Sequence, residues 1–166
     1  MKKILAKASK IKIVLTDVDG VLTDGGMYYT KDGDIMKKFH VRDGMGVTLL
    51  RKSNIPSIIV TKEKNAIIKQ WAKKMKIHKL LMGIINKETV LKNICKIYNV
   101  VPSEVCYIGD DVNDLQLLKL VGLSVTPSDG IIEAQKLCDY VCKNKGGNGA
   151  FREVTDMILL SQKVKL

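Results

Sequence analysis

Short apolar runs rich in β-branched residues alternate with amphipathic segments along this chain of 166 residues. Such alternation is typical of an α/β fold in which helices cover both faces of a parallel sheet. We predict strands over residues 10–16, 57–60, 80–82, 105–108, 123–125 and 140–141. We predict helices over residues 45–52, 64–75, 87–98, 114–121, 131–136 and 150–160. This pattern favours one doubly wound, Rossmann-like domain spanning residues 1–166.

One segment interrupts the alternation directly after the first predicted strand. Residues 27–30 and 34–41 both resemble strands, and the Asp32-Gly33 turn between them predicts a β-hairpin over residues 27–41. The hairpin should project beside the carboxyl ends of the parallel strands, where ligands bind in such folds.

The composition argues against several classes of protein. Two histidines cannot supply a histidine-based metal site, and the four cysteines have no CxxC or zinc-like spacing, which favours reduced, mostly buried thiols. The net charge is +11, but only three of the 28 basic residues are arginines and aromatic residues make up 5%. We therefore expect lysines on solvated helix faces and no nucleic-acid partner. We find no apolar run long enough for a signal peptide or a membrane span, so we expect a cytoplasmic protein without membrane contact.

Two acidic clusters follow predicted strands. Asp17 and Asp19 follow the first strand, and Asp110, Asp111 and Asp114 follow the strand over residues 105–108. Because the carboxyl ends of parallel strands meet at one edge of a sheet, the two clusters should share a pocket whose oxygen ligands suit Mg²⁺. The alternative is that each acid only caps a helix or fills a turn.

Two further polar residues lie where they could hold a phosphate group. Thr61 follows the strand over residues 57–60, and Lys87 begins a predicted helix. A hydroxyl and an ammonium group near helix amino termini are suitable phosphate ligands. Taken singly, Thr61 could be a helix cap and Lys87 a solvated charge.

The segment DVDGV at 17–21, Thr61, Lys87 and GDDVND at 109–114 resemble, in order, the four motifs of the haloacid dehalogenase superfamily. The resemblance implies that Asp17 is a nucleophile that forms an aspartyl-phosphate, and that Asp19 protonates the leaving oxygen and later deprotonates water. It also implies a Mg²⁺ ion held by Asp17, Asp110 and the main-chain carbonyl of Asp19. Asp111 and Asp114 would then be auxiliary.

Within the superfamily the chain resembles the 3-deoxy-D-manno-octulosonate 8-phosphate phosphatases. The resemblance rests on LTDVDGVLTDGGMYY, KKFHVRDGMG, YIGDDVND, VGLSV and GGNGAFREV. It implies a capless, usually tetrameric enzyme that removes the terminal phosphate of a 3-deoxy-2-ulosonic acid. Independently, one helix and one strand already fill the stretch between Thr61 and Lys87, which leaves no room there for a cap domain. We therefore expect a neighbouring subunit to complete the pocket, around the hairpin. Tyr28, Tyr29, Met36 and Phe39 are candidate interface residues, or half of them could pack on their own sheet.

The chain departs from this family after Thr61, where Lys62-Glu63-Lys64 replaces the usual Gly-Arg. A Glu-Lys pair resembles the branch that acts on nonulosonic acid 9-phosphates of the KDN or N-acylneuraminate type. Glu63 and Lys64 could therefore contact the substrate, or they could be exposed charges at a helix start. Arg42 and Arg152 could bind the substrate carboxylate, or they could form structural salt bridges.

Two alternative functions belong to other classes of protein. A phosphoacceptor receiver module also gathers acids, a threonine and a lysine on a parallel sheet. Its phosphorylated aspartate would follow a strand in the middle of the sequence, whereas Asp17 follows the first predicted strand. A non-catalytic partner domain would resemble the tail module of some acylneuraminate cytidylyltransferases. The intact set of Asp17, Asp19, Lys87 and Asp110 favours turnover over both.

Overall fold

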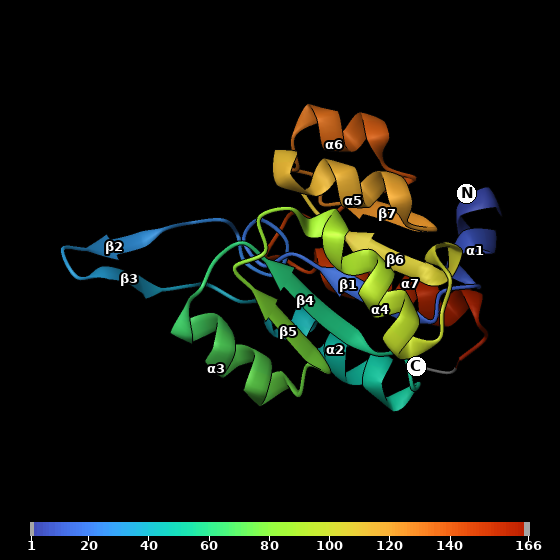
Figure 1. Ribbon diagram of the computed structural model, residues 1–166, viewed down its shortest axis with the longest axis horizontal. Coiled ribbons are helices and arrows are strands. Elements are labelled where there is room, and N and C mark those ends of the chain that lie inside the picture. The colour runs from blue at the N-terminus through green and yellow to red at the C-terminus, as the bar shows by residue number, and fades with distance from the viewer. Residues whose placement is uncertain (1, 165–166) are drawn as a thin grey trace.

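A six-stranded parallel sheet forms the centre of the computed structural model, which describes residues 2–164 (Figure 1). The strand order is β5-β4-β1-β6-β7-β8, and every neighbouring pair is parallel. The strands are β1 (Ile13–Thr16), β4 (Ser57–Thr61), β5 (Lys79–Met82), β6 (Val105–Ile108), β7 (Leu123–Thr126) and β8 (Tyr140–Val141). The predicted doubly wound α/β sheet is therefore confirmed.

Helices cover both faces of this sheet, because successive strand residues point to opposite sides. On β1, Ile13 and Leu15 face one buried cluster while Val14 faces the other. The cluster around Val14 is covered by α1 (Lys2–Ala8), α2 (Val41–Lys52), α3 (Ala66–Met75) and α7 (Ala150–Ser161). The opposite cluster is covered by α4 (Leu91–Tyr98), α5 (Leu115–Leu120) and α6 (Ile132–Leu137). Three short 3₁₀ segments complete the described chain: η1 (Lys87–Val90), η2 (Pro102–Glu104) and η3 (Val112–Asp114).

Several predicted boundaries were wrong, each for a local reason. The first strand begins at Ile13, since α1, which we did not predict, ends in a turn at residues 9–10. Helix α2 begins at Val41 rather than at residue 45, because the His40 side chain caps it by accepting a hydrogen bond from the Arg42 amide. The helices predicted from residues 87 and 114 begin with the 3₁₀ turns η1 and η3.

The predicted hairpin is present as the antiparallel pair β2 (Tyr28–Thr30) and β3 (Gly33–Met36). Gly33 has a φ of +109°, which glycine adopts without strain at this turn. The hairpin extends well beyond the body of the molecule (Figure 1). After β3, Phe39 stacks on Trp71 with ring centroids 4.6 Å apart, so Phe39 packs within its own subunit.

The stretch between β4 and η1 contains only α3 and β5, which agrees with the expected lack of a cap domain. Among the described residues, no helix has the length and apolar character needed to cross a bilayer.

Candidate active site

Asp17 directly follows β1, which lies in the middle of the sheet. Its amide donates a 3.0 Å hydrogen bond to the carbonyl of Ile108, which ties the start of the loop after β1 to the end of β6. The Asp17 residue is only 6% exposed, and its Oδ2 lies 2.8 Å from the ammonium nitrogen of Lys87. The fold therefore presents one buried carboxylate at the carboxyl edge of the sheet.

Lys87 is fully buried, which is rare for a lysine unless its charge is paired. The start of η1 places its Nζ between two carboxylates, 2.8 Å from Asp17 and 2.6 Å from Asp114. The pKa of Lys87 is raised, because attraction to Asp17 and Asp114 outweighs the opposing effect of burial. A positive charge is thus held beside the Oδ2 atom of Asp17.

Asp114 organises the neighbouring groups. Its Oδ1 accepts hydrogen bonds from Lys87 Nζ and from the Tyr107 hydroxyl, the latter at 2.5 Å. Its Oδ2 accepts from the amides of Asp110 and Asp111, at 2.9 and 3.2 Å. Both oxygens are already engaged, so Asp114 fixes the Asp110 loop and Lys87 in place.

Glycines allow the loops of the site to approach closely. Gly20 has a φ of +86°, and a Cβ atom there would lie 2.0 Å from the Oδ2 of Asp110. A Cβ at Gly146 would lie 1.9 Å from the carbonyl oxygen of Gly20, and the Gly147 amide donates to the carbonyl of Val21. The glycine-rich stretch before α7 therefore packs directly against the loop after β1.

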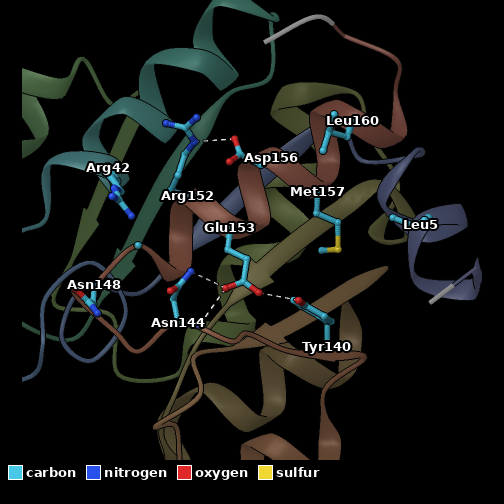
Figure 2. A pocket seen from close by; sticks show the side chains of 11 residues that line it. Leu5, Arg42, Tyr140, Asn144, Asn148, Arg152, Glu153, Asp156, Met157 and Leu160 are labelled. Carbon is cyan, nitrogen blue, oxygen red and sulfur yellow. Dashed lines mark hydrogen bonds and ion pairs between the residues drawn. The ribbon is translucent and has the colours of Figure 1, made fainter.

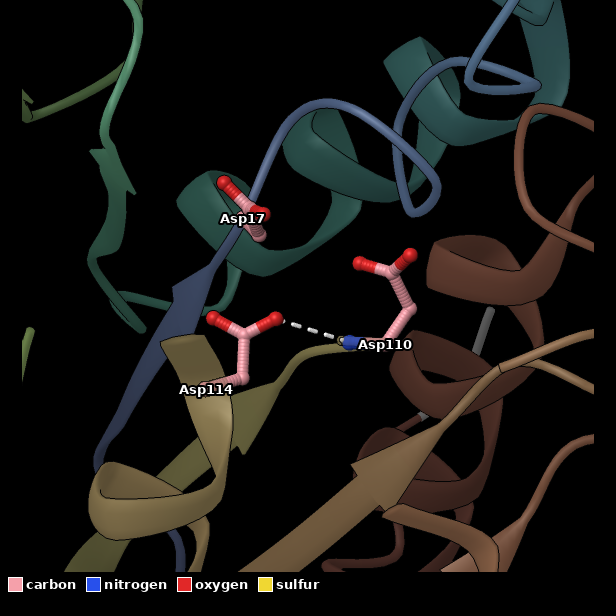
Figure 3. Close-up of side chains that lie close together, drawn as sticks. All are labelled: Asp17, Asp110 and Asp114. Atoms are coloured by element: carbon pink, nitrogen blue, oxygen red, sulfur yellow. Dashed lines mark hydrogen bonds between the residues drawn. The ribbon is translucent and has the colours of Figure 1, made fainter. Parts of the chain in front are cut away.

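The carboxylates of Asp17, Asp110 and Asp114 converge, with one oxygen of each within 4.8 Å of the others (Figure 3). Burial, opposed by Lys87 and reinforced by Asp114, raises the pKa of Asp17 to about 7. Burial and repulsion by Asp17 and Asp114 raise the pKa of Asp110 to about 8. Among the described residues, Asp17 Oδ1 and Asp110 Oδ1 are buried without a hydrogen-bond partner.

The burial and charge of these carboxylates suit a metal ion. Two buried, unpartnered carboxylate oxygens and mutually repelling charges are what a divalent cation would satisfy, and hard oxygen donors suit Mg²⁺. The residues therefore fit a divalent cation held by Asp17 and Asp110.

A pocket of about 270 Å³ lies at the carboxyl ends of the parallel strands. Thr61, at the end of β4, lines it, and its Oγ1 accepts a hydrogen bond from the Glu63 amide. The remaining lining residues are Asp17, Asp19, Lys62, Glu63, Asp110, Asp111, Val112 and Asn113. The structure thus brings together most of the residues that the sequence indicated.

Lys87, which we predicted to bind the phosphate group, does not line this pocket, and neither do three of the four residues that we predicted to contact the rest of the substrate. Arg42 and Arg152 line a separate pocket of about 610 Å³ beside α7, where Arg152 forms a 2.6 Å ion pair with Asp156 (Figure 2). The Lys64 side chain instead lies against Gly83. Within one subunit, therefore, only Glu63 of the four candidates is placed to contact a substrate.

Sequence reasoning missed two residues of the site. Tyr107 lies on β6 and reads as an ordinary core residue, yet its hydroxyl is bonded to Asp114. Lys37 follows β3 and pairs with Asp19 at 2.8 Å. The sequence signal for Lys37 was the string KKFHVRDGMG, which carried the family resemblance but did not show which lysine turns inward.

A buried strand-end aspartate, a buried lysine, a strand-end threonine and a second acidic loop on a parallel sheet define a hydrolase of the haloacid dehalogenase type. Residues 52–154 match the family model described as haloacid dehalogenase-like hydrolase. The chain belongs to this superfamily and, on the relatives below, to its family of 3-deoxy-D-manno-octulosonate 8-phosphate phosphatases.

The similar proteins cover nearly the whole chain. The 3-deoxy-D-manno-octulosonate 8-phosphate phosphatase KdsC of Haemophilus influenzae is 38% identical over 94% of this chain and 87% of its own length. The enzyme of the same name from Escherichia coli K12 is 36% identical over 96% and 85%. The crystal structure of the Moraxella catarrhalis phosphatase, in complex with magnesium, phosphate and KDO, has a TM-score of 0.94 and 36% identity, and covers 98% of this chain and 94% of that one. The chain is therefore a phosphatase rather than a receiver module or a non-catalytic domain.

Proposed function

We propose that this chain is a Mg²⁺-dependent phosphatase that converts 3-deoxy-D-manno-octulosonate 8-phosphate to the free sugar acid and phosphate through an aspartyl-phosphate on Asp17. The observation that carries the proposal is the buried Asp17 carboxylate, paired with Lys87 and facing the unpartnered Oδ1 of Asp110. The substrate named for the relatives supports the choice of sugar acid.

In the first step a carboxylate oxygen of Asp17 attacks the phosphorus atom, and the bond from phosphorus to the sugar oxygen breaks. Asp19, which lines the pocket, donates a proton to that leaving oxygen. Thr61, which lines the pocket, binds a phosphoryl oxygen, and Lys87, which is buried against Asp17, offsets the charge that develops between phosphate and carboxylate. The products of this step are the free sugar acid and an acyl phosphate on Asp17.

In the second step a water molecule attacks the phosphorus of the acyl phosphate, and Asp19 accepts its proton. The bond from phosphorus to the Asp17 oxygen breaks, which restores the carboxylate and releases inorganic phosphate. A bound Mg²⁺ ion, held by Asp17, Asp110 and the carbonyl of Asp19, would shield the charge between the phosphate and the attacking carboxylate. Asp111 lines the pocket beside Asp110 and is proposed to support that ligand set.

A second candidate substrate is favoured by one observation. Lys62 and Glu63 both line the pocket, at the position where the chain resembles the nonulosonate 9-phosphate branch. Either side chain could contact the hydroxyls or carboxylate of a nine-carbon sugar acid.

Comparison of kcat/KM for the octulosonate 8-phosphate and for KDN and N-acylneuraminate 9-phosphates tests this choice. We expect the octulosonate ester to be preferred by roughly 10-fold or more, because each well-placed contact contributes more than 1 kcal/mol. A simple aryl phosphate serves as the control for intact chemistry. Preference for a nonulosonate ester would replace the proposed substrate, and a Glu63→Gln variant would then be expected to lose that preference.

We also propose that a neighbouring subunit completes the pocket in a homotetramer. The hairpin is rich in exposed apolar side chains, with Met27 70%, Tyr29 63% and Ile35 60% exposed. A gathering of exposed apolar side chains on one element is typical of interaction sites. The hairpin leaves the body on the side where the parallel strands have their carboxyl ends (Figure 1), and Asp17 directly follows β1. A partner that packs against the base of the hairpin would therefore lie near Asp17.

The double variant Tyr29→Lys and Ile35→Lys should weaken this assembly, because it places two charges where apolar contacts are expected. We expect a shift toward monomers in analytical ultracentrifugation and at least about a 10-fold fall in kcat/KM, since an open pocket admits water. The control is Lys31→Ala at the exposed tip of the hairpin. A wild-type protein that is monomeric and fully active would overturn the proposal.

A further inference from the structure

Lys37 is a lysine at the base of a projecting hairpin, yet its side chain is only 4% exposed. Its Nζ lies 2.8 Å from Asp19 Oδ1 and 3.2 Å from Asp34 Oδ2. Burial alone would lower the pKa of Lys37, but hydrogen bonding and attraction to Asp19 and Asp34 have the larger effect. The pKa is therefore raised, and the side chain stays protonated. A lysine on an ordinary hairpin would keep its ammonium group in water, so this placement calls for an explanation.

The second carboxylate of this pair connects the hairpin to the phosphate-binding side of the pocket. Asp34 lies on β3, and its Oδ2 accepts a 3.1 Å hydrogen bond from the side-chain amide of Asn65. Asn65 is the N-cap of α3, where its own Oδ1 accepts from the Ile67 amide at 2.7 Å. A continuous chain of contacts therefore runs from the loop after Thr61, through the hairpin, to Asp19.

The Asp19 carboxylate is held by one of its oxygens. Thr23 Oγ1 donates to Oδ1 at 3.2 Å, and Lys37 Nζ donates to the same atom at 2.8 Å. Both of these contacts fall on Oδ1, and the side chain is 30% exposed on the pocket side. The second oxygen, Oδ2, is thus left for a substrate in the pocket.

From this geometry we infer that Lys37 is a positioning residue that fixes the Asp19 carboxylate so that Oδ2 faces the leaving oxygen of the substrate. The inference deepens the proposed function, on which it rests, because it assigns to the hairpin a role in proton transfer. General acid catalysis depends on a donor within hydrogen-bond reach, and a displacement of about 1 Å can cost on the order of 10²-fold in rate. Asp34 and Asn65 in turn hold Lys37, so the hairpin must be folded onto the body for Asp19 to be aligned.

The substitution Lys37→Met tests the inference, because it keeps a long side chain but removes the donor. The readout is kcat/KM, which covers the steps up to departure of the leaving group, for two classes of ester. An alkyl phosphate such as the octulosonate ester needs a proton on its leaving oxygen, whereas p-nitrophenyl phosphate releases a stable phenolate without one. We expect a loss of roughly 30-fold or more on the alkyl ester and less than about 3-fold on p-nitrophenyl phosphate.

Two further variants separate a positioning role of Lys37 from a general effect of the substitution. Lys37→Arg retains the charge and the donors and should recover most of the activity on the alkyl ester. The neighbouring Lys38→Met is the matched control, because Lys38 is exposed and, among residues 2–164, its ammonium group pairs with the surface carboxylate of Asp24 alone, at 3.2 Å. We expect no change in the ratio of the two kcat/KM values for Lys38→Met. If Lys37→Met does not fold, as judged by its circular dichroism and melting curve, Lys37→Gln is measured in the same way.

An equal loss on both esters would overturn the inference, since it would indicate general damage to the site. Wild-type values for both esters in Lys37→Met would overturn it as well. If the wild type does not hydrolyse the octulosonate ester, the proposed substrate fails. A simple alkyl phosphate then takes that ester's place in the comparison, so Lys37 is still judged.

Discussion

Asp17→Asn should abolish phosphate release, with a fall in kcat of at least about 10⁴-fold, the scale on which loss of a nucleophile is measured. An amide oxygen has nearly the same shape as the carboxylate oxygen that it replaces, but it cannot form a stable acyl phosphate. The fold should survive, because Lys87 keeps its 2.6 Å contact with Asp114. Steady-state phosphate release at saturating Mg²⁺ measures the effect.

The matched control is Asp24→Asn, which removes an exposed carboxylate from the same loop and should leave kcat within about 2-fold. Acid quenching during turnover, followed by intact-mass measurement, should find a phosphoryl adduct on the wild type and none on Asp17→Asn. Unchanged phosphate release by Asp17→Asn would show that another group is the nucleophile. A long-lived adduct on the wild type without phosphate release would instead favour storage over turnover.

The layout of the sheet could be predicted from the sequence because it depends on local patterns. Strands such as β4 and β6 are continuous apolar runs, as expected where both faces of a sheet are covered. The hairpin was predictable from one Asp-Gly turn between two short β-like runs. Helix α1 was missed because it has only seven residues, and Ile4 and Ala8 are too short an apolar pattern to indicate a helix.

The positions of the site residues were predictable from topology, but their contacts were not. Asp17 and Asp110 had to meet, because parallel strands place their carboxyl ends at one edge of a sheet. No local pattern indicates that Lys87 lies between Asp17 and Asp114, or that Tyr107 points at Asp114. Those contacts depend on how η1 and η3 pack on the sheet, which is a tertiary property.

Lys37 and Lys38 illustrate the same limit. They are adjacent lysines in a chain with 28 basic residues, and composition favours a solvated role for both. In the structure Lys38 fulfils that expectation, whereas Lys37 turns inward to Asp19 and Asp34. The two lysines directly follow β3, and successive residues of an extended chain point to opposite sides.

Asp110→Asn should stabilise the metal-free protein at pH 8 while it removes activity. The pKa of Asp110 is raised from 3.8 to about 8 in the folded protein, because burial and the charges of Asp17 and Asp114 oppose its ionisation. A carboxyl group whose pKa is raised by folding binds more protons in the folded than in the unfolded state. Its contribution to stability is therefore present below pH 4 and is lost as the pH rises toward 8.

A change of one in pKa corresponds to about 1.4 kcal/mol of unfolding free energy. Even half of the rise in the pKa of Asp110 would therefore destabilise the folded protein by on the order of 3 kcal/mol at pH 8. For a chain of this size that predicts a melting temperature roughly 6–12 °C higher for metal-free Asp110→Asn than for the wild type at pH 8, and no difference at pH 4. Thermal melts in chelator at both pH values measure the effect. The control is Asp111→Asn. Asp111 is exposed and caps η3, and asparagine can form the same cap, so this variant should show no gain in melting temperature.

Addition of Mg²⁺ should reverse the order of stability at pH 8. In the wild type the ion would neutralise the facing carboxylates of Asp17 and Asp110, and a ligand at 100 times its dissociation constant adds about 2.7 kcal/mol. Asp110→Asn lacks one of the two unpartnered carboxylate oxygens, so its melting temperature should respond weakly to Mg²⁺ and its kcat should fall by about 10²-fold or more. Equal stabilisation of both proteins by Mg²⁺ would place the cation elsewhere. The repulsion that makes the metal-free protein less stable at pH 8 is, on this view, the same electrostatic feature that attracts the cation needed for catalysis.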